Sequence, residues 1–381
     1  MYLFFLGSQK SVSIAEVIAC FGNDVSLVGT DFLKVASVDE QKVRSLGGIP
    51  RVDRFLKEFS LEDGLEKIYR TVAIQLETND SRKYSLSFIG FRNDDVFPEM
   101  KAAAKVVGKN PEGDRQKSIA TYATVFYVLQ KGGKSFSIVK TEGKYELYET
   151  FFVQDPNYWT MIDFDRPHRE KEVGMLPAKL ARIMINLATP DASDYILDPF
   201  VGLGTVSMQA DLLGYKSIGM DINRQNVSLA EENCQWMVKK GLSANRQKIF
   251  VVHDVKKPFF ENITQRGIGA IVCEPFLGPM RSRPFKSYTE AEQSFRQHVR
   301  PLITALIQRG AETLQNGQKI VFIKPIYKYI ENHQSKWYNS QVQYDSQLWS
   351  DWTKKHDLKP LQWVQKDSTI GREIMVLEKI K

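Results

Sequence analysis

A glycine loop between an apolar strand and a helix constrains the fold of this chain more than any other feature. Residues 195–205 read Tyr-Ile-Leu-Asp-Pro-Phe-Val-Gly-Leu-Gly-Thr, so a short apolar run ends in an acid and a glycine turn leads into a helix predicted over 205–213. This arrangement presents backbone N–H groups and the positive end of a helix dipole at the carboxyl edge of a sheet. The loop therefore predicts an open α/β domain with a ligand site at that edge.

The glycine spacing argues against a dinucleotide as the ligand. Gly202 and Gly204 are not followed by the third glycine that lets the helix pack closely in a dinucleotide site. Asp198, directly before the loop, would repel a pyrophosphate but attract a cationic amine. These residues favour S-adenosylmethionine as the cofactor and make an NAD-dependent dehydrogenase the weakest alternative.

Strands and helices alternate regularly through residues 176–381. Apolar runs predict strands over 195–200, 216–221, 248–253, 268–273 and 318–323, with helices over 205–213, 224–239 and around 289–314. Repeated βαβ order predicts a mostly parallel, doubly wound sheet. The final two strands, near 360–365 and 372–379, lack a crossover helix, which indicates an antiparallel last strand. An amphipathic helix over 176–188 should turn Lys179, Arg182 and Asn186 away from the core.

Residues 1–154 mix short strands and helices, which predicts a separate α+β domain without a catalytic cluster. Ser13 and Glu16 have the spacing of a capping box and predict a helix that starts there. Residues 155–175 are polar and charged, and we expect them to form a linker.

The distribution of charge indicates a polyanionic partner. The net charge is +7, with −2 in residues 1–165 and +9 in residues 166–381. A basic domain can bind a polyanion by counterion release, although the same charge could serve solubility alone. No apolar run approaches 18 residues, so we expect no membrane span. Three scattered cysteines suit a reducing, cytoplasmic location.

Four acids end four successive predicted strands: Asp198, Asp221, Asp254 and Glu274. The carboxyl ends of parallel strands meet at one edge, so these side chains should share a site. We expect Asp198 to accept from the amine of S-adenosylmethionine, Asp221 from the ribose hydroxyls and Asp254 from the adenine amino group. The predicted cofactor site also includes Phe200, Gly202, Gly204, Thr205, Ile222 and Val255. Taken singly, each acid could merely terminate a strand or cap the next helix.

Glu274-Pro275-Phe276 is the candidate reaction site. A carboxylate and a carbonyl could orient the N–H bonds of an exocyclic base amine, and an aromatic ring could hold a base taken out of its stack. The N1–H and N2–H donors of guanine lie side by side, which modestly favours guanine. The simpler alternative is a strand end with a proline stop and a core phenylalanine. For the substrate phosphates we propose four cations, each of which could instead be solvated: Arg166, Lys179, Arg281 and Arg283.

The segment from Asp198 to Thr205, with the helix from Pro177 to Ala188 before it, resembles the THUMP-domain tRNA guanine-N2 methyltransferases of the amino-methyltransferase superfamily. Arg166-Pro167 and Arg372-Glu373-Ile374 are also similar to that family. The resemblance covers most of residues 155–381. It implies a Rossmann-like, S-adenosylmethionine-dependent domain that acts without a metal and forms N2-methylguanosine in tRNA. We also expect a monomer and leave any protein activator open.

The resemblance extends only loosely to the N-terminal half, where it implies a ferredoxin-like and THUMP-like RNA-binding region. RNA contact there would use a local basic patch of Lys101, Lys105, Lys109, Arg115 and Lys117. The chain departs from the family at its signature, usually Asp-Pro-Pro-Tyr-Gly, which reads Glu-Pro-Phe-Leu-Gly over 274–278. Two alternatives therefore stay open: an N6-adenine methyltransferase acting on DNA or RNA, and a non-catalytic RNA- or cofactor-binding module.

Overall fold

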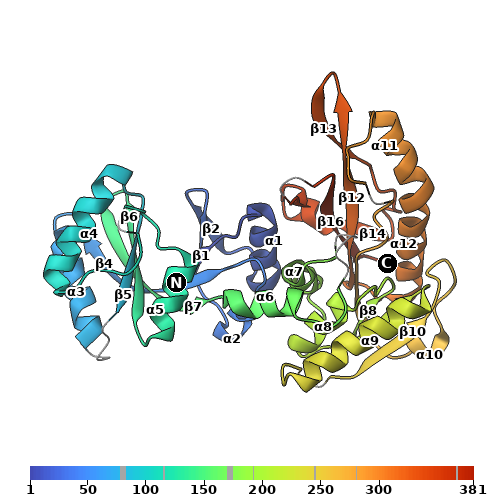
Figure 1. Cartoon of the computed structure of the whole chain (residues 1–381), viewed down its shortest axis with the longest axis horizontal. Helices are drawn as coiled ribbons and strands as arrows, with labels where there is room; N and C mark the ends of the chain where they lie inside the picture. The colour runs from blue at the N-terminus through green and yellow to red at the C-terminus, as the bar shows by residue number, and fades with distance from the viewer. Residues whose placement is uncertain are drawn as a thin grey trace. The chain divides into compact units, whose positions relative to one another are not determined.

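The computed structural model describes residues 1–77, 83–114, 116–169, 175–191, 193–243, 246–279, 281–365 and 368–381. The chain divides into two compact units (Figure 1). Unit 1 consists of Met1–Lys10, Phe21–Arg44 and Ile49–Tyr158, and unit 2 of Ser11–Cys20, Ser45–Gly48 and Trp159–Lys381. The expected linker over 155–175 is helical over Pro156–Phe164 (α6) instead, and its residues 170–174 lie outside the described part.

Unit 1 is built on a seven-stranded sheet in the order β2-β3-β1-β4-β7-β6-β5. All neighbours are antiparallel except β5 and β6. The strands are β1 (Tyr2–Phe5), β2 (Val25–Val28), β3 (Phe32–Val35), β4 (Arg51–Ser60), β5 (Tyr84–Ile89), β6 (Lys134–Thr141) and β7 (Lys144–Val153). The helices are α2 (Glu40–Val43), α3 (Gly64–Glu77), α4 (Asn93–Val107) and α5 (Tyr122–Gln130). Unit 1 therefore mixes helices and strands, but it is not the continuous range 1–154, because Ser11–Cys20 and Ser45–Gly48 belong to unit 2.

The two faces of the unit 1 sheet differ in chemistry. Helices α3 and α4 bury apolar side chains against one face, including Leu86 and Phe136. The other face holds a fully buried ion pair, in which Asp53 accepts from Nε and Nη2 of Arg51 at 2.7 Å each. Ser87 and Ser137 accept further hydrogen bonds from the guanidinium. A buried pair must be well hydrogen-bonded to repay the loss of hydration, and this one meets that condition.

Unit 2 contains a nine-stranded sheet with the main order β10-β9-β8-β11-β12-β16-β14. The first five strands are parallel and β16 runs antiparallel to β12, so the parallel core with an antiparallel last strand is confirmed. The sheet as a whole is mixed, because β13, β14 and β15 add antiparallel pairings that the sequence did not predict. The strands are β8 (Tyr195–Asp198), β9 (Lys216–Asp221), β10 (Lys248–Val252), β11 (Ile268–Cys273), β12 (Lys319–Glu331), β13 (Gln334–Asn339), β14 (Trp349–Asp351), β15 (Leu361–Trp363) and β16 (Ile370–Lys379).

Side chains along the central strands pack alternately into two hydrophobic cores. Ile271 and Cys273 of β11 face one core, and Ala270 and Val272 face the other. The helices are α7 (Ala178–Ala188), α8 (Thr205–Leu212), α9 (Arg224–Lys239), α10 (Glu261–Thr264), α11 (Tyr288–Ser294), α12 (Arg300–Thr313) and α13 (Trp352–Lys355). A π-helical turn over Phe295–Val299 interrupts the long helix expected around 289–314. None of the helices in the described ranges is both long and apolar enough to cross a membrane.

Two local predictions for unit 2 are wrong: the start of the helix that holds Ser13 and Glu16, and the exposure of the polar side of the helix over 176–188. Both involve the hydrogen bonds of Glu16. The helix with Ser13 and Glu16 is α1 (Lys10–Phe21), which starts before the proposed capping box. Glu16 instead accepts from the backbone N–H groups of Gly47 and Gly48 at 2.8 and 2.7 Å, and from Asn186 of α7 at 2.7 Å. The polar side of α7 is therefore buried and not turned to solvent. Tertiary contacts thus use residues that the local pattern assigned to a helix start and to an exposed face.

Candidate active site

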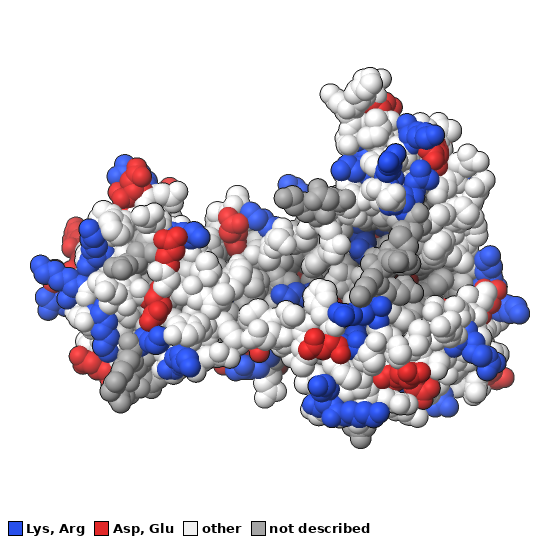
Figure 2. Space-filling view, in the orientation of Figure 1, with Lys and Arg blue, Asp and Glu red and all other residues white. Residues whose placement is uncertain are grey.

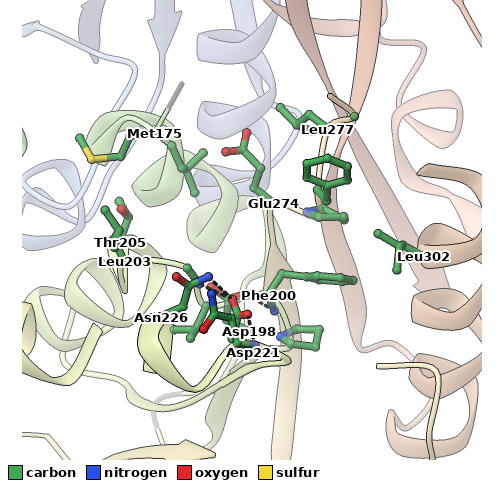
Figure 3. Close-up of a pocket in the computed structure, with 18 of the residues that line it drawn as sticks. Met175, Asp198, Phe200, Leu203, Thr205, Asp221, Asn226, Glu274, Leu277 and Leu302 are labelled. Atoms are coloured by element: carbon green, nitrogen blue, oxygen red, sulfur yellow. Dashed lines mark hydrogen bonds between the residues drawn. The ribbon is translucent and has the colours of Figure 1, made fainter. Parts of the chain in front are cut away.

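A cavity of about 940 Å³ opens at the carboxyl edge of the parallel strands of unit 2 (Figure 3). It lies where the connections from β8 reverse direction, since β8 is flanked by β9 on one side and β11 on the other. Open α/β sheets bind ligands at such a point. All four acids predicted from the strand ends line this cavity, namely Asp198, Asp221, Asp254 and Glu274.

The glycine loop forms one wall of the cavity. Asp198 accepts from the backbone N–H of Phe200 at 3.0 Å, and Asp221 accepts from that of Gly202 at 3.1 Å. Gly202 has a positive φ of 49°, which favours glycine because it lacks a Cβ. Thr205 then begins α8, and its side chain lines the cavity. The acids thus position the loop as well as facing the ligand space.

Gly204 is the one predicted cofactor residue that does not line the cavity. Its φ is +81°, and an added Cβ would lie 3.1 Å from Ala230 of α9. Its role is therefore close packing of the helix start against α9. The other eight predicted cofactor residues line the cavity: Asp198, Phe200, Gly202, Thr205, Asp221, Ile222, Asp254 and Val255.

Asp198 is the most deeply buried of the four acids. Its side chain is buried, and burial raises the pKa of its carboxyl well above the ordinary value, with Asp221 and Glu274 raising it further. Mutually repelling acids in a low-dielectric cleft create a negative potential that a cationic ligand relieves. The cleft is therefore suited to a ligand that brings positive charge.

Asp221 and Asp254 keep acceptor capacity at the cavity wall. Asp221 accepts from the N–H of Asn223 at 2.9 Å and from the Asn226 side chain at 3.3 Å. Asp254 accepts from the N–H of Lys256 at 3.0 Å. A carboxylate has about four lone-pair sites, so each acid can still accept from hydroxyl or amino donors of a ligand. Ile222 is exposed beside Asp221 and offers an apolar surface at the rim.

Glu274 follows β11 and forms an ion pair with Arg372 of β16, with Nε to Oε1 at 2.6 Å. Burial raises the pKa of Glu274, and the charge and hydrogen bond of Arg372 oppose that shift. Pro275 is buried beside it, whereas the Phe276 ring is 48% exposed at the cavity wall. The backbone of the next turn is held by Tyr327, whose hydroxyl donates to the carbonyl of Leu277 at 2.6 Å. The three candidate reaction residues therefore share one wall.

The four cations proposed for phosphate contact do not act together. Arg166 is buried and donates to Thr205 Oγ1 at 2.9 Å, so it cannot reach a substrate phosphate. Lys179 lies over the Trp159 ring at 5.2 Å and does not line the cavity. Arg281 does line it, stacked on Phe285 at 4.0 Å and paired with Glu290.

Arg283 is exposed and lies outside the cavity lining. Of the four cations, Arg281 is therefore the one that the structure places at the site. The burial of Arg166 does not support the prediction that it contacts a substrate phosphate. Its position near a charged segment does not indicate that its guanidinium hydrogen-bonds to Thr205 of α8.

Several residues that line the cavity were not predicted from the sequence. Asn223 caps α9 and was visible as a polar residue directly after Asp221. Leu302 of α12 and Thr369 before β16 come from distant segments and carried no local signal. Arg372 stood in a recognisable triplet, yet nothing in its surroundings connected it with Glu274. Within the described ranges, no three His, Cys, Asp or Glu side chains form a group that could hold a metal ion.

Comparisons with known proteins point to methyltransferases. A family model described as DNA methylase matches residues 64–232, a range that includes the glycine loop and Asp221. The tRNA (guanine(10)-N2)-dimethyltransferase of Methanocaldococcus jannaschii is 34% identical over 144 residues, 35% of this chain and 38% of that protein. The enzyme of the same name from Methanothermobacter thermautotrophicus is 42% identical over 72 residues, 18% of this chain and 21% of that protein.

The matched stretches thus span about a fifth and two fifths of the length of these two relatives. Among solved structures, TrmN from Thermus thermophilus aligns over 100% of this chain and 99% of its own, with 14% identity and a TM-score of 0.49.

Proposed function

We propose that this protein is an S-adenosylmethionine-dependent RNA methyltransferase that methylates the exocyclic N2 amine of a guanosine in tRNA. The observation that carries the proposal is the cavity itself, in which three strand-end acids and a glycine loop stand beside the Glu274-Pro275-Phe276 wall. Two similar proteins are named tRNA (guanine(10)-N2)-dimethyltransferase, which supports tRNA as the substrate class.

The chemistry of the cavity fits this cofactor. S-adenosylmethionine carries an ammonium and a sulfonium. Burial first, and then the like charges of Asp221 and Glu274, raise the pKa of Asp198, and a bound cation would favour its ionised form. In the proposed arrangement Asp198 accepts from the ammonium, Asp221 from the ribose hydroxyls and Asp254 from the adenine amino group. The backbone at the start of α8 and the ring of Phe200 complete the cradle.

When bound, S-adenosylmethionine would supply an electrophilic methyl group: the base amine would gain the methyl carbon, the carbon–sulfur bond would break to leave a neutral thioether, and one amine proton would pass to solvent. The chain's own residues orient the base. Glu274 and the Pro275 carbonyl accept from its N–H groups, which turns the nitrogen lone pair toward the methyl group. The half-exposed ring of Phe276 stacks on the extruded base. Positioning of this kind requires no strong general base.

Basic surface near the cavity supports an RNA substrate. Lys and Arg side chains gather over the β12–β13 hairpin in Figure 2. The base of this hairpin is joined to the loop that follows Arg281, because the N–H of Phe285 donates to the carbonyl of Lys328 at 2.9 Å. A phosphate backbone that crosses this surface would lead a nucleotide toward the cavity.

For unit 1 we propose an RNA-binding, THUMP-like role through its local basic patch. Four of the five patch residues belong to the described part, namely Lys101, Lys105, Lys109 and Lys117, whereas Arg115 lies outside it. We further propose that the protein acts as a monomer in the cytoplasm, where its tRNA substrate is found. The linker role of residues 155–175 stays a prediction.

The modified nucleoside tests the proposal. The full chain is incubated with methyl-labelled cofactor and either total tRNA or genomic DNA, and the digested nucleosides are identified by mass spectrometry. We expect labelled N2-methylguanosine from tRNA. Methylated adenine as the sole product would instead establish the alternative, an N6-adenine methyltransferase, which the DNA methylase family match favours.

A Glu274→Ala variant separates catalysis from binding alone. We expect it to keep cofactor affinity but lose methyl transfer, because Glu274 orients the base and not the cofactor. If the wild type binds cofactor and tRNA yet transfers nothing, and the variant behaves identically, the chain is a non-catalytic binding module.

A further inference from the structure

The Glu274–Arg372 ion pair joins two strands that are not neighbours. Glu274 directly follows β11 and Arg372 lies in β16, with β12 between them in the sheet. Arg372 stands opposite Pro325 of β12 and is 5% exposed. The guanidinium donates to both carboxylate oxygens, from Nε at 2.6 Å and from Nη2 at 3.5 Å. Both side chains line the cavity, so the pair is part of the wall that a base would meet.

Charged groups around Glu274 act on it in opposite directions. Burial raises the pKa of Glu274, whereas the charge and hydrogen bond of Arg372 from β16 favour its ionised form. Glu274 in turn raises the pKa of Asp198 of β8. Arg281 also lines the cavity but is paired with Glu290. Among the described residues, the titratable groups on adjacent elements also include Cys273 of β11, Tyr327 of β12, and the Lys324–Glu373 pair between β12 and β16.

The ionisation of an acid decides which base edge it can read. A carboxylate offers two acceptors, which match the adjacent N1–H and N2–H donors of guanine. A protonated acid offers one acceptor and one donor, which match the N6–H donor and N1 acceptor of adenine. Flipped bases are read along this edge. The same side chain would thus prefer different bases in its two states.

We propose that Arg372 is a positioning residue that holds Glu274 as a carboxylate facing the cavity, and that this ion pair makes the site select guanine over adenine. The inference rests on the proposed methyltransferase function and names the group that sets its base specificity. In Figure 3 the Glu274 carboxylate points away from Asp198 and Asp221, so the base-reading acid is separate from the acids assigned to the cofactor.

The first test is the pH dependence of kcat/KM for tRNA at saturating cofactor. Arg372→Gln removes the charge, so Glu274 should protonate at higher pH and the acid limb of N2-methylguanosine formation should move up by about 1–3 pH units. Arg372→Lys keeps a positive charge and should return the limb toward the wild-type position. Arg266→Gln, at an exposed arginine outside the cavity lining, is the matched control. An acid limb that stays at the wild-type pH in Arg372→Gln overturns the proposal.

The second test replaces the carboxylate with a fixed acceptor–donor pair. Glu274→Gln should lower guanosine methylation by about 10- to 100-fold and shift the product ratio toward N6-methyladenosine. An unchanged ratio with guanosine still preferred overturns the proposal, also in the case that Arg372→Gln does not fold. Binding of S-adenosylhomocysteine, measured by calorimetry, should remain within about twofold of wild type in both variants.

Different results would overturn the proposed function and the role of Arg372. If the wild type produces N6-methyladenosine, the proposed function itself is wrong. If it produces N2-methylguanosine while the variants leave both the acid limb and the product ratio unchanged, the function stands and the role of Arg372 is refuted.

Discussion

Replacing Asp198 with asparagine should make the protein more stable and less able to bind its cofactor. Burial, Asp221 and Glu274 all raise the pKa of Asp198 above its ordinary value. The native state therefore holds this proton at pH values where the unfolded chain has lost it. Stability from this group is complete below the unfolded pKa of about 3.9 and is lost as pH rises toward the folded pKa.

The size of the effect follows from linkage. Each pH unit between the unfolded and folded pKa values costs about 1.4 kcal/mol of folding free energy in the wild type. Asp198→Asn removes that cost, and 1 kcal/mol corresponds to about 2–4 °C in Tm for a domain of this size. In the proposed cofactor complex the change removes a charged hydrogen bond worth about 1.5–3 kcal/mol, so affinity should fall by about 10- to 150-fold.

The assay is thermal unfolding of the full chain from pH 4 to pH 8, together with calorimetric titration of S-adenosylhomocysteine. The Tm difference between Asp198→Asn and wild type should grow with pH and vanish near pH 4. Asp194→Asn, outside the cavity lining, serves as the matched control and should show neither effect. A Tm difference independent of pH, or an unchanged affinity, would refute the reasoning.

Three further predictions concern other parts of the chain. Asp53→Ala leaves the fully buried guanidinium of Arg51 without its carboxylate partner. The change should lower the free energy of unfolding of unit 1 by about 3–5 kcal/mol in urea, while cofactor affinity in unit 2 stays unchanged. Phe276→Ala removes a half-exposed ring from the cavity wall and should lower kcat/KM for tRNA by about 5- to 150-fold without altering cofactor binding, and equal losses in both would contradict a stacking role. Gly204→Leu forces a side chain against Ala230 at a positive φ and should lower Tm, whereas an unchanged Tm would show that α8 and α9 can separate freely.

Sequence alone could predict the acids of the site because each one ends an apolar run. Asp198 and Asp221 end strands and Glu274 directly follows one, and parallel strands bring their carboxyl ends to one edge. Asp198 also precedes a glycine turn whose positive φ values glycine favours. The parallel sheet with an antiparallel last strand followed from the same alternation of strands and helices.

The contacts that sequence could not predict join distant segments. Glu274 and Arg372 are 98 residues apart, and their pairing depends on the antiparallel insertion of β16 beside β12. Arg166 lies in a charged stretch that indicates exposure, yet its guanidinium packs against Thr205. Whether a charged side chain is buried depends on which element packs over it, and the local sequence pattern does not show this.

The hydrogen bond between Glu16 and Asn186 also has a consequence for biosynthesis. Its two residues are 170 positions apart in the chain, and at about 5–20 residues per second a ribosome needs roughly 10–30 s to make the second after the first. During that time the α1 segment has been synthesised but its partner helix α7 has not. Unit 2 therefore cannot complete its core as a contiguous fragment that begins at Trp159, and a gene cut at the unit boundary would yield a domain lacking one of its own helices.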